Sequence, residues 1–92
     1  MIGSLTVELH LPDARSLKDK RQVVKSLIDT VRHRFNVSVA ELEHQDLHQR
    51  ATIGVVCVAN EKAHVERVLN AAREIIDGRP DAVPTSVTVE ML

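Results

Sequence analysis

Several cationic residues stand where the sequence predicts the start of a helix. The stretch SLKDKRQVVKSL, residues 16–27, contains Lys18, Lys20 and Arg21 within its first turns. Cations at this end of a helix oppose the backbone dipole, which costs roughly 0.3–1 kcal/mol each. A phosphate bound by these three side chains and by the first-turn N–H groups would remove that cost. The alternative is a solvated helix surface, because Lys and Arg are good helix formers.

The predicted helix places its cations unevenly around its axis. With about 3.6 residues per turn, Lys18, Arg21, Lys25 and Arg32 fall on one flank, beside the apolar stripe. Lys20 instead falls within the apolar stripe, so we expect its side chain to run past the sheet edge to reach solvent. No glycine-rich loop precedes the helix, which excludes a nucleotide P-loop.

The positive charge of the chain is concentrated in this segment. The whole chain has a net charge of −1, but residues 13–34 carry seven Lys or Arg and three Asp residues. RNA is the anion we expect, and the chain has one Phe and no Tyr or Trp to stack on bases. Binding would therefore depend on phosphate contacts and weaken as salt rises.

A second set of polar residues, His44, Asp46 and His48, lies in the short stretch EHQDLHQR at residues 43–50. Two histidines four residues apart and an aspartate are possible metal ligands. The spacing is common, no cysteine joins it, and a hairpin loop rarely holds helical geometry. We therefore expect a polar loop with no metal, although loops often contact a protein or RNA partner.

The elements that position these residues follow from periodicity. Ser16 is the expected N-cap of the first helix, with Asp19 three residues on in a capping box. Asn60 is the expected cap of the second helix, and Gly78 is expected in the left-handed conformation at its end. Alternating or apolar runs predict the strands, and apolar spacing of three and four predicts the helices. The expected ranges are strand 4–11, helix 17–35, strand 37–43, strand 51–59, helix 61–77 and strand 86–91.

This βαββαβ order predicts an α+β, ferredoxin-like fold. Right-handed crossovers would place both helices on one face of a four-stranded antiparallel sheet. A length of 92 residues predicts one domain, residues 1–92.

The other face of the sheet is expected to carry apolar residues. If Ile53 and its alternate neighbours point toward the helices, Val56 and Val58 point away, and Ala40 and Leu42 could lie beside them. A small apolar patch on an open face suggests self-association, so a homodimer is a second possible assembly.

No grouping of residues predicts catalysis. Cys57 lies within a strand with no cation expected beside it, and we expect a buried structural thiol. No Ser/His/Asp or Cys/His grouping and no acid/base pair of carboxylates can be assembled, so we expect neither an enzyme nor a cofactor. A single cysteine fits the cytoplasm, and neither a signal peptide nor a membrane-spanning run is seen.

The stretches SLKDKRQVVKSL and FNVSVAELEHQDLHQRATIGV, the latter at residues 35–55, together resemble the YlxP-like family of small bacterial proteins. The resemblance implies a ferredoxin-like fold over essentially the whole chain. Genes of this family commonly lie beside genes for translation initiation and ribosome maturation, which implies a role near the ribosome. The family often has Trp where this chain has His48, and it offers no established catalytic residues.

These observations predict a non-catalytic accessory factor that contacts RNA or a ribosomal subunit. Its phosphate-binding residues would be Lys18, Lys20, Arg21, Lys25 and Arg32. The alternative is a homo-oligomeric interaction module that uses the open sheet face.

Overall fold

Six elements follow one another in this computed structural model, which describes residues 1–92. They are β1 (Ile2–His10), α1 (Leu17–Arg34), β2 (Ser38–Glu43), β3 (Arg50–Val58), α2 (Lys62–Asp77) and β4 (Val83–Met91). At the start of α1, the Ser16 Oγ accepts a hydrogen bond of 3.1 Å from the Asp19 N–H. The Asp19 carboxylate in turn accepts one of 3.0 Å from the Arg15 N–H, so both predicted cap residues hold backbone donors of the helix start.

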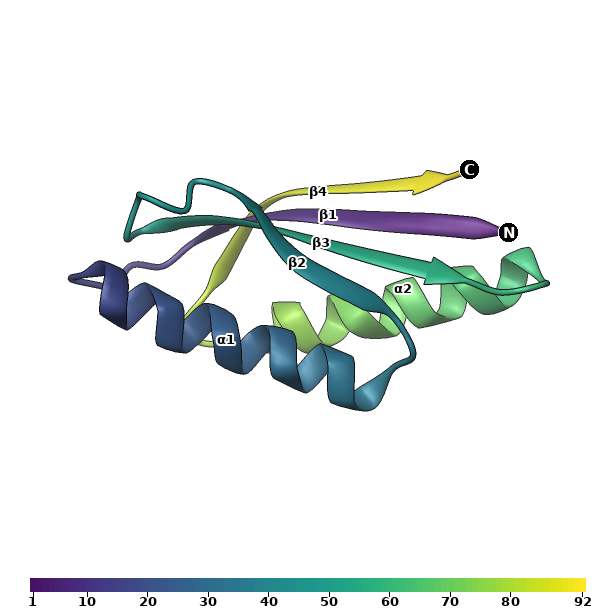
Figure 1. Cartoon of the computed structure of the whole chain (residues 1–92), viewed down its shortest axis with the longest axis horizontal. Coiled ribbons are helices and arrows are strands. Elements are labelled where there is room, and N and C mark those ends of the chain that lie inside the picture. Colours follow the sequence, from purple (N-terminus) through teal and green to yellow (C-terminus); the bar gives the residue numbers. More distant parts are fainter.

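The four strands form one antiparallel sheet in the order β2-β3-β1-β4. Both helices lie on one face of it, with α1 against β2 and α2 against β1 and β3 (Figure 1). The predicted ferredoxin-like architecture is confirmed. Neither helix is long and apolar enough to cross a membrane.

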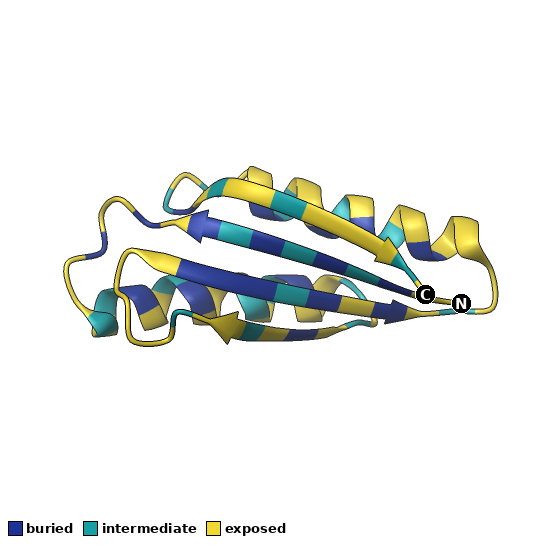
Figure 2. Cartoon of the chain, turned by 90° about the horizontal axis from the view of Figure 1, so that it is seen from above, coloured by how far each residue is buried: buried dark blue, intermediate teal, exposed yellow.

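The core lies between the sheet and the two helices. Burial alternates along β1 and along most of β3 (Figure 2), because every second side chain points toward the helices. Leu5 and Val7 of β1 and Ile53 and Val55 of β3 are fully buried, and Cys57 is nearly so. The helices contribute Leu27, Val31, Val65, Leu69 and Ile76, among others, to this layer.

Three local expectations are wrong. Helix α2 is capped by Glu61 rather than Asn60, and no side chain bonds its first N–H groups. Gly78 has φ −78°, so α2 ends in right-handed geometry. Strand β4 begins at Val83 rather than Ser86 and includes Pro84, which an edge strand tolerates because one side of it has no neighbouring strand.

Gly3 lets α2 approach β1 closely. A Cβ atom on Gly3 would lie 2.5 Å from Val65 Cγ1 and 2.9 Å from Leu69 Cδ1, both on α2. These distances are shorter than any van der Waals contact, so a side chain at position 3 would push the helix away from the sheet.

We therefore expect Gly3→Ala to lower the free energy of unfolding by about 1–3 kcal/mol through overpacking, as measured by urea denaturation. Gly78→Ala is the matched control, because its new Cβ would come no closer than 3.4 Å to its neighbours. That change should stay within about 0.5 kcal/mol of the wild type. Equal effects of the two substitutions would contradict a packing role for Gly3.

Candidate functional site

The expected cationic flank lies on the exposed side of α1 that faces the edge of β2. Lys18, Arg21, Lys25 and Arg32 are all exposed. The last three, together with Asp29, line the α1 side of a shallow groove of about 470 Å³ between α1 and β2. The groove is open along its length, so it presents a surface rather than an enclosed pocket. We call these four cations the α1 flank.

Most charges of the α1 flank are free of strong internal pairing. Lys25 Nζ lies 4.0 Å from the Asp29 carboxylate, with both side chains well exposed, and such pairs contribute little. The Arg32 guanidinium donates a hydrogen bond of 2.9 Å to the Val39 carbonyl, which orients it without neutralising its charge. Neither Lys18 nor Arg21 has an ion pair or a side-chain hydrogen bond. The flank therefore presents positive charge to solvent.

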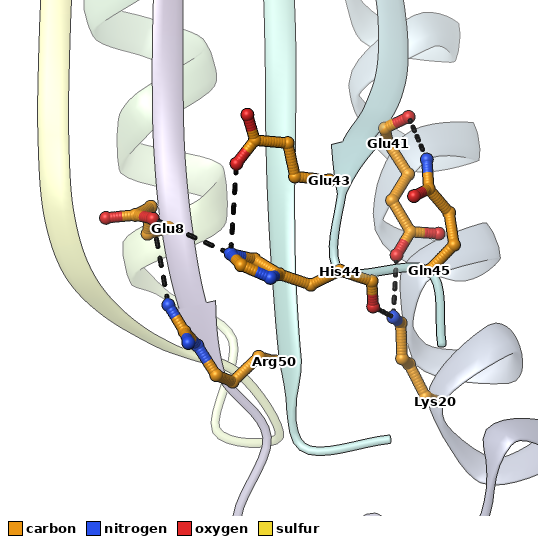
Figure 3. A network of polar contacts seen from close by, with 7 residues as sticks. All are labelled: Glu8, Lys20, Glu41, Glu43, His44, Gln45 and Arg50. Atoms are coloured by element: carbon orange, nitrogen blue, oxygen red, sulfur yellow. Dashed lines mark hydrogen bonds and ion pairs between the residues drawn. The ribbon is translucent and has the colours of Figure 1, made fainter. Parts of the chain in front are cut away.

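Lys20 behaves differently, and its expected role in anion binding is wrong. Its side chain is 1% exposed and does not reach solvent. Its ammonium lies 2.8 Å from Glu41 Oε2, an oxygen with no further hydrogen-bond partner. It also donates to the His44 carbonyl (Figure 3). A further hydrogen bond of 2.8 Å goes to the Leu47 carbonyl. A lysine already held by a carboxylate and two carbonyls cannot meet an external phosphate.

The loop between β2 and β3 is shaped around this ammonium. His44 adopts φ 66°, the left-handed conformation that is rare for residues other than glycine. Its carbonyl also accepts a hydrogen bond of 3.0 Å from the Leu47 N–H, which closes a tight turn. The two loop carbonyls thereby converge on Lys20, and the loop is fastened to the first turn of α1.

The predicted loop residues do not come together. The His44 imidazole lies on the open face of the sheet, where Nε2 is 4.0 Å from Glu8 and 3.9 Å from Glu43 (Figure 3). Asp46 and His48 are exposed elsewhere on the loop. No group of three or more His, Cys, Asp or Glu side chains is arranged to hold a metal ion, so the metal alternative for this loop has no geometric support.

The open face contains a hollow of about 220 Å³. Leu42, Val56 and Val58 are exposed as the alternation predicts, at 49%, 43% and 71%. Ser4, Thr6 and Ser38 border the hollow, and Gly54 provides its floor, with Leu42 leaning over the place of the missing side chain. Gly54 was not among the predicted site residues, although a glycine inside an apolar strand is a known sign of close approach.

A second feature that sequence reasoning missed is the pair formed by Arg79 and Asp81 before β4. Their side chains share two hydrogen bonds, of 3.0 and 2.8 Å. The hydrogen bond from Arg79 is the main cause that lowers the pKa of Asp81 below its usual value. Arg79 also donates to the Ser26 hydroxyl at 3.0 Å, which ties this loop to α1. The pair is therefore structural.

Comparison with known proteins gives a family and a fold. Residues 2–89 match the family model described as "Protein of unknown function (DUF503)". The chain is 36% identical to the "Uncharacterized protein YlxP" of Bacillus subtilis (strain 168), over 98% of each chain. It is also similar to the solution NMR structure of a de novo designed protein with a ferredoxin fold. That match has a TM-score of 0.59 and 15% identity, and covers 100% of this chain and 87% of the other.

The contacts of Lys20 predict a large loss of stability on its removal. Lys20→Met keeps the length of the side chain but leaves the Glu41 carboxylate and two carbonyls without a cation. We expect the free energy of unfolding to fall by about 2–4 kcal/mol, below the full cost of breaking a wholly buried pair because Glu41 keeps partial exposure. Urea denaturation measures the difference.

Two further variants test this interpretation. Lys18→Met, at an exposed position of the same turn, should change stability by less than about 0.5 kcal/mol. Adding Glu41→Leu to Lys20→Met should recover part of the loss, because no unpaired carboxylate is then left behind. If Lys20→Met were no more harmful than Lys18→Met, the buried ion pair would have no structural importance.

Proposed function

The chain belongs to the DUF503 family of proteins of unknown function, as its two motifs predict, and we propose that it is a non-catalytic RNA-binding factor. The binding surface is the α1 flank. The observation that carries this proposal is the exposure of Lys18, Arg21, Lys25 and Arg32 along one side of one helix, with no strong internal ion pair. Lys20 is not part of this surface.

The spacing of the α1 flank suits a polymer of phosphates better than a single small anion. Lys18 and Arg32 are fourteen positions apart, or about 21 Å along the helix axis. A compact anion such as a nucleotide would meet only one or two of these charges. A nucleic-acid strand that follows the groove beside β2 meets Arg21, Lys25 and Arg32 in succession and reaches Lys18 where it extends past the groove to the start of the helix.

In the proposed binding, affinity depends on the charge of the RNA backbone and not on the base sequence. The open face of the sheet carries no aromatic side chain, and Phe35, the single aromatic residue, is half-buried at the end of α1. Without a stacking platform, base identity has little influence on affinity. The genomic setting implied by the YlxP-like resemblance supports ribosomal RNA as the polymer.

Salt dependence gives the proposal a quantitative form. Four phosphate contacts on single-stranded RNA correspond to a slope of about −2.8 in log K against log salt. Raising the salt from about 50 to about 200 mM should then weaken binding about 50-fold. A much smaller slope would mean that the α1 flank is not the contact surface.

Charge reversal on the α1 flank is the direct test. In Lys18→Glu/Arg21→Glu/Lys25→Glu, we expect loss of co-sedimentation with ribosomal subunits in a sucrose gradient and loss of binding to a ribosomal RNA fragment. Each side chain is exposed, so folding should persist, as circular dichroism will check. Arg32 is left unchanged because it also orients the edge of β2.

The matched control reverses three exposed cations of α2, namely Lys62, Arg67 and Arg73, to glutamate. It changes the total charge by the same amount on the other helix. Retained binding in this control, with loss in the α1 variant, supports the proposal. Equal loss in both would indicate attraction by total charge alone, and unchanged binding in the α1 variant would end the proposal.

The open face supports a second candidate function, a homo-oligomeric interaction module. The hollow above Gly54 is smaller than the about 300 Å³ at which small-molecule sites begin, so it suits an aliphatic side chain of another protein surface. Around it the face carries mainly uncharged side chains, apart from Glu90 opposite Ser4, and further charged side chains gather at the end near His44. A second copy of this chain is the occupant we consider.

Gly54→Val tests this candidate by filling the hollow. The new Cβ would lie 2.7 Å from Leu42 Cδ1, and Leu42 is an exposed side chain that can move, so the fold should tolerate it. Under this candidate, analytical ultracentrifugation should show an oligomer that Gly54→Val weakens. Identical masses for the variant and the wild type would exclude the hollow as an interface.

A further inference from the structure

The two edges of the sheet are protected very differently. At the β2 edge, the Val39 carbonyl accepts a hydrogen bond of 2.9 Å from Arg32, and the Glu41 carbonyl accepts one of 3.5 Å from Gln45. The strand has six residues, and its register with β3 shifts between Glu41 and Glu43. Short, irregular and side-chain-capped edges are how proteins prevent strand pairing between molecules. The β2 edge is therefore closed.

The β4 edge is less protected over its regular part, from Ser86 to Met91, because Pro84 and the register shift with β1 lie before it. The Leu92 N–H donates to the Ile2 carbonyl at 2.8 Å, and in antiparallel pairing the direction of the backbone groups alternates. Val87, Val89 and Met91 therefore direct their N–H and C=O groups away from the sheet. No side chain of the protein bonds these outward groups. From Val83 to Met91 the strand is VPTSVTVEM, with one charged residue, Glu90.

The helix-side surface of β4 is also incompletely covered. Val89 lies opposite Leu5 of β1, so its side chain is on the helix face, yet it is 47% exposed. Helix α2 lies mainly against β1 and β3 and covers the outer strand only in part, with Val87 and Met91 half-buried against the core. Strand β4 thus combines free backbone groups with an apolar, β-branched surface, which is a template for another strand.

We propose that β4 is a homodimer interface at which two copies of this chain pair antiparallel and form one continuous eight-stranded sheet. The two-fold axis passes at Thr88, where Val87 of one copy exchanges backbone hydrogen bonds with Val89 of its partner. In this register Glu90 stands opposite Ser86 and not opposite the second Glu90, so the only charge of the strand meets no like charge. Such an interface is self-complementary and closed, with no tendency to form fibres.

The partner that pairs with β4 in this proposal is a second copy of the same chain. Antiparallel pairing of one strand with an identical strand satisfies both copies equally, and the regular part of β4, from Ser86 to Met91, surrounds the proposed axis. The α1 flank lies at the opposite edge of the sheet, beside β2. The dimer therefore leaves the RNA-binding surface free, and this inference stands or falls independently of the proposed function.

The mass in solution is the first measurement. We expect analytical ultracentrifugation of the full chain to show a species of twice the 10.2 kDa chain mass. Val89→Pro removes one outward N–H and no hydrogen bond within the chain, so the fold should persist and the two-chain species should be lost. A wild-type protein that stays at one chain mass up to millimolar concentration overturns the proposal.

A matched pair of lysine substitutions locates the axis. Thr88→Lys places two like charges opposite each other across the proposed axis and should weaken the dimer. Thr6→Lys, on the residue of β1 that directly faces Thr88, carries the same charge one strand further inside and should leave the dimer intact. A dimer that survives both Val89→Pro and Thr88→Lys, or that is lost with Gly54→Val instead, overturns the β4 interface.

Discussion

The arrangement of α1, β2 and the β2–β3 loop depends on the contacts that the buried ammonium of Lys20 makes. Burying a charge is strongly unfavourable unless partners surround it, and here the Glu41 carboxylate and two loop carbonyls do so. Because Lys20 belongs to the apolar stripe of α1, its fixed position also sets the rotation of the helix about its axis. That rotation turns Lys18 and Arg21 outward, so the electrostatic surface of the protein depends on an internal ion pair.

The two edges of the sheet differ in the side chains that lie beside them. Beside β2, cationic side chains of α1 serve the fold and the surface at once, since Arg32 caps an edge carbonyl while its charge stays exposed. Beside β4, no side chain bonds the outward backbone groups of Val87, Val89 and Met91. Under the two proposals, RNA contacts lie on one side of the molecule and strand pairing on the other. The strand order of this small domain keeps the two proposed surfaces apart.

Local sequence patterns were sufficient to predict the architecture. The site was predicted less well, because its contacts join residues that are far apart in the sequence. Alternation and helical spacing predicted all six elements, and the outward direction of Val56 followed from the same alternation. Lys20 was misjudged because its partner Glu41 lies twenty-one positions away, and no local pattern reveals that two carbonyls of a loop will turn toward it. Asn60 and Glu61 are neighbouring residues of similar polarity, so the chosen cap depended on the path of the chain from β3. The contact between Arg79 and Ser26 joins segments that meet only after folding.

The placement of Cys57 makes the protein convenient for spectroscopic labelling. It is the only cysteine, and its thiol is enclosed between the sheet and the helices with 3% exposure. Maleimide or nitroxide reagents, which require an accessible thiolate, will therefore react far more slowly with the native chain than with a cysteine introduced at its surface. A single engineered thiol can then carry a fluorophore or spin probe without prior removal of the natural sulfur, and distances between domains of a larger assembly become measurable from an otherwise unmodified sequence.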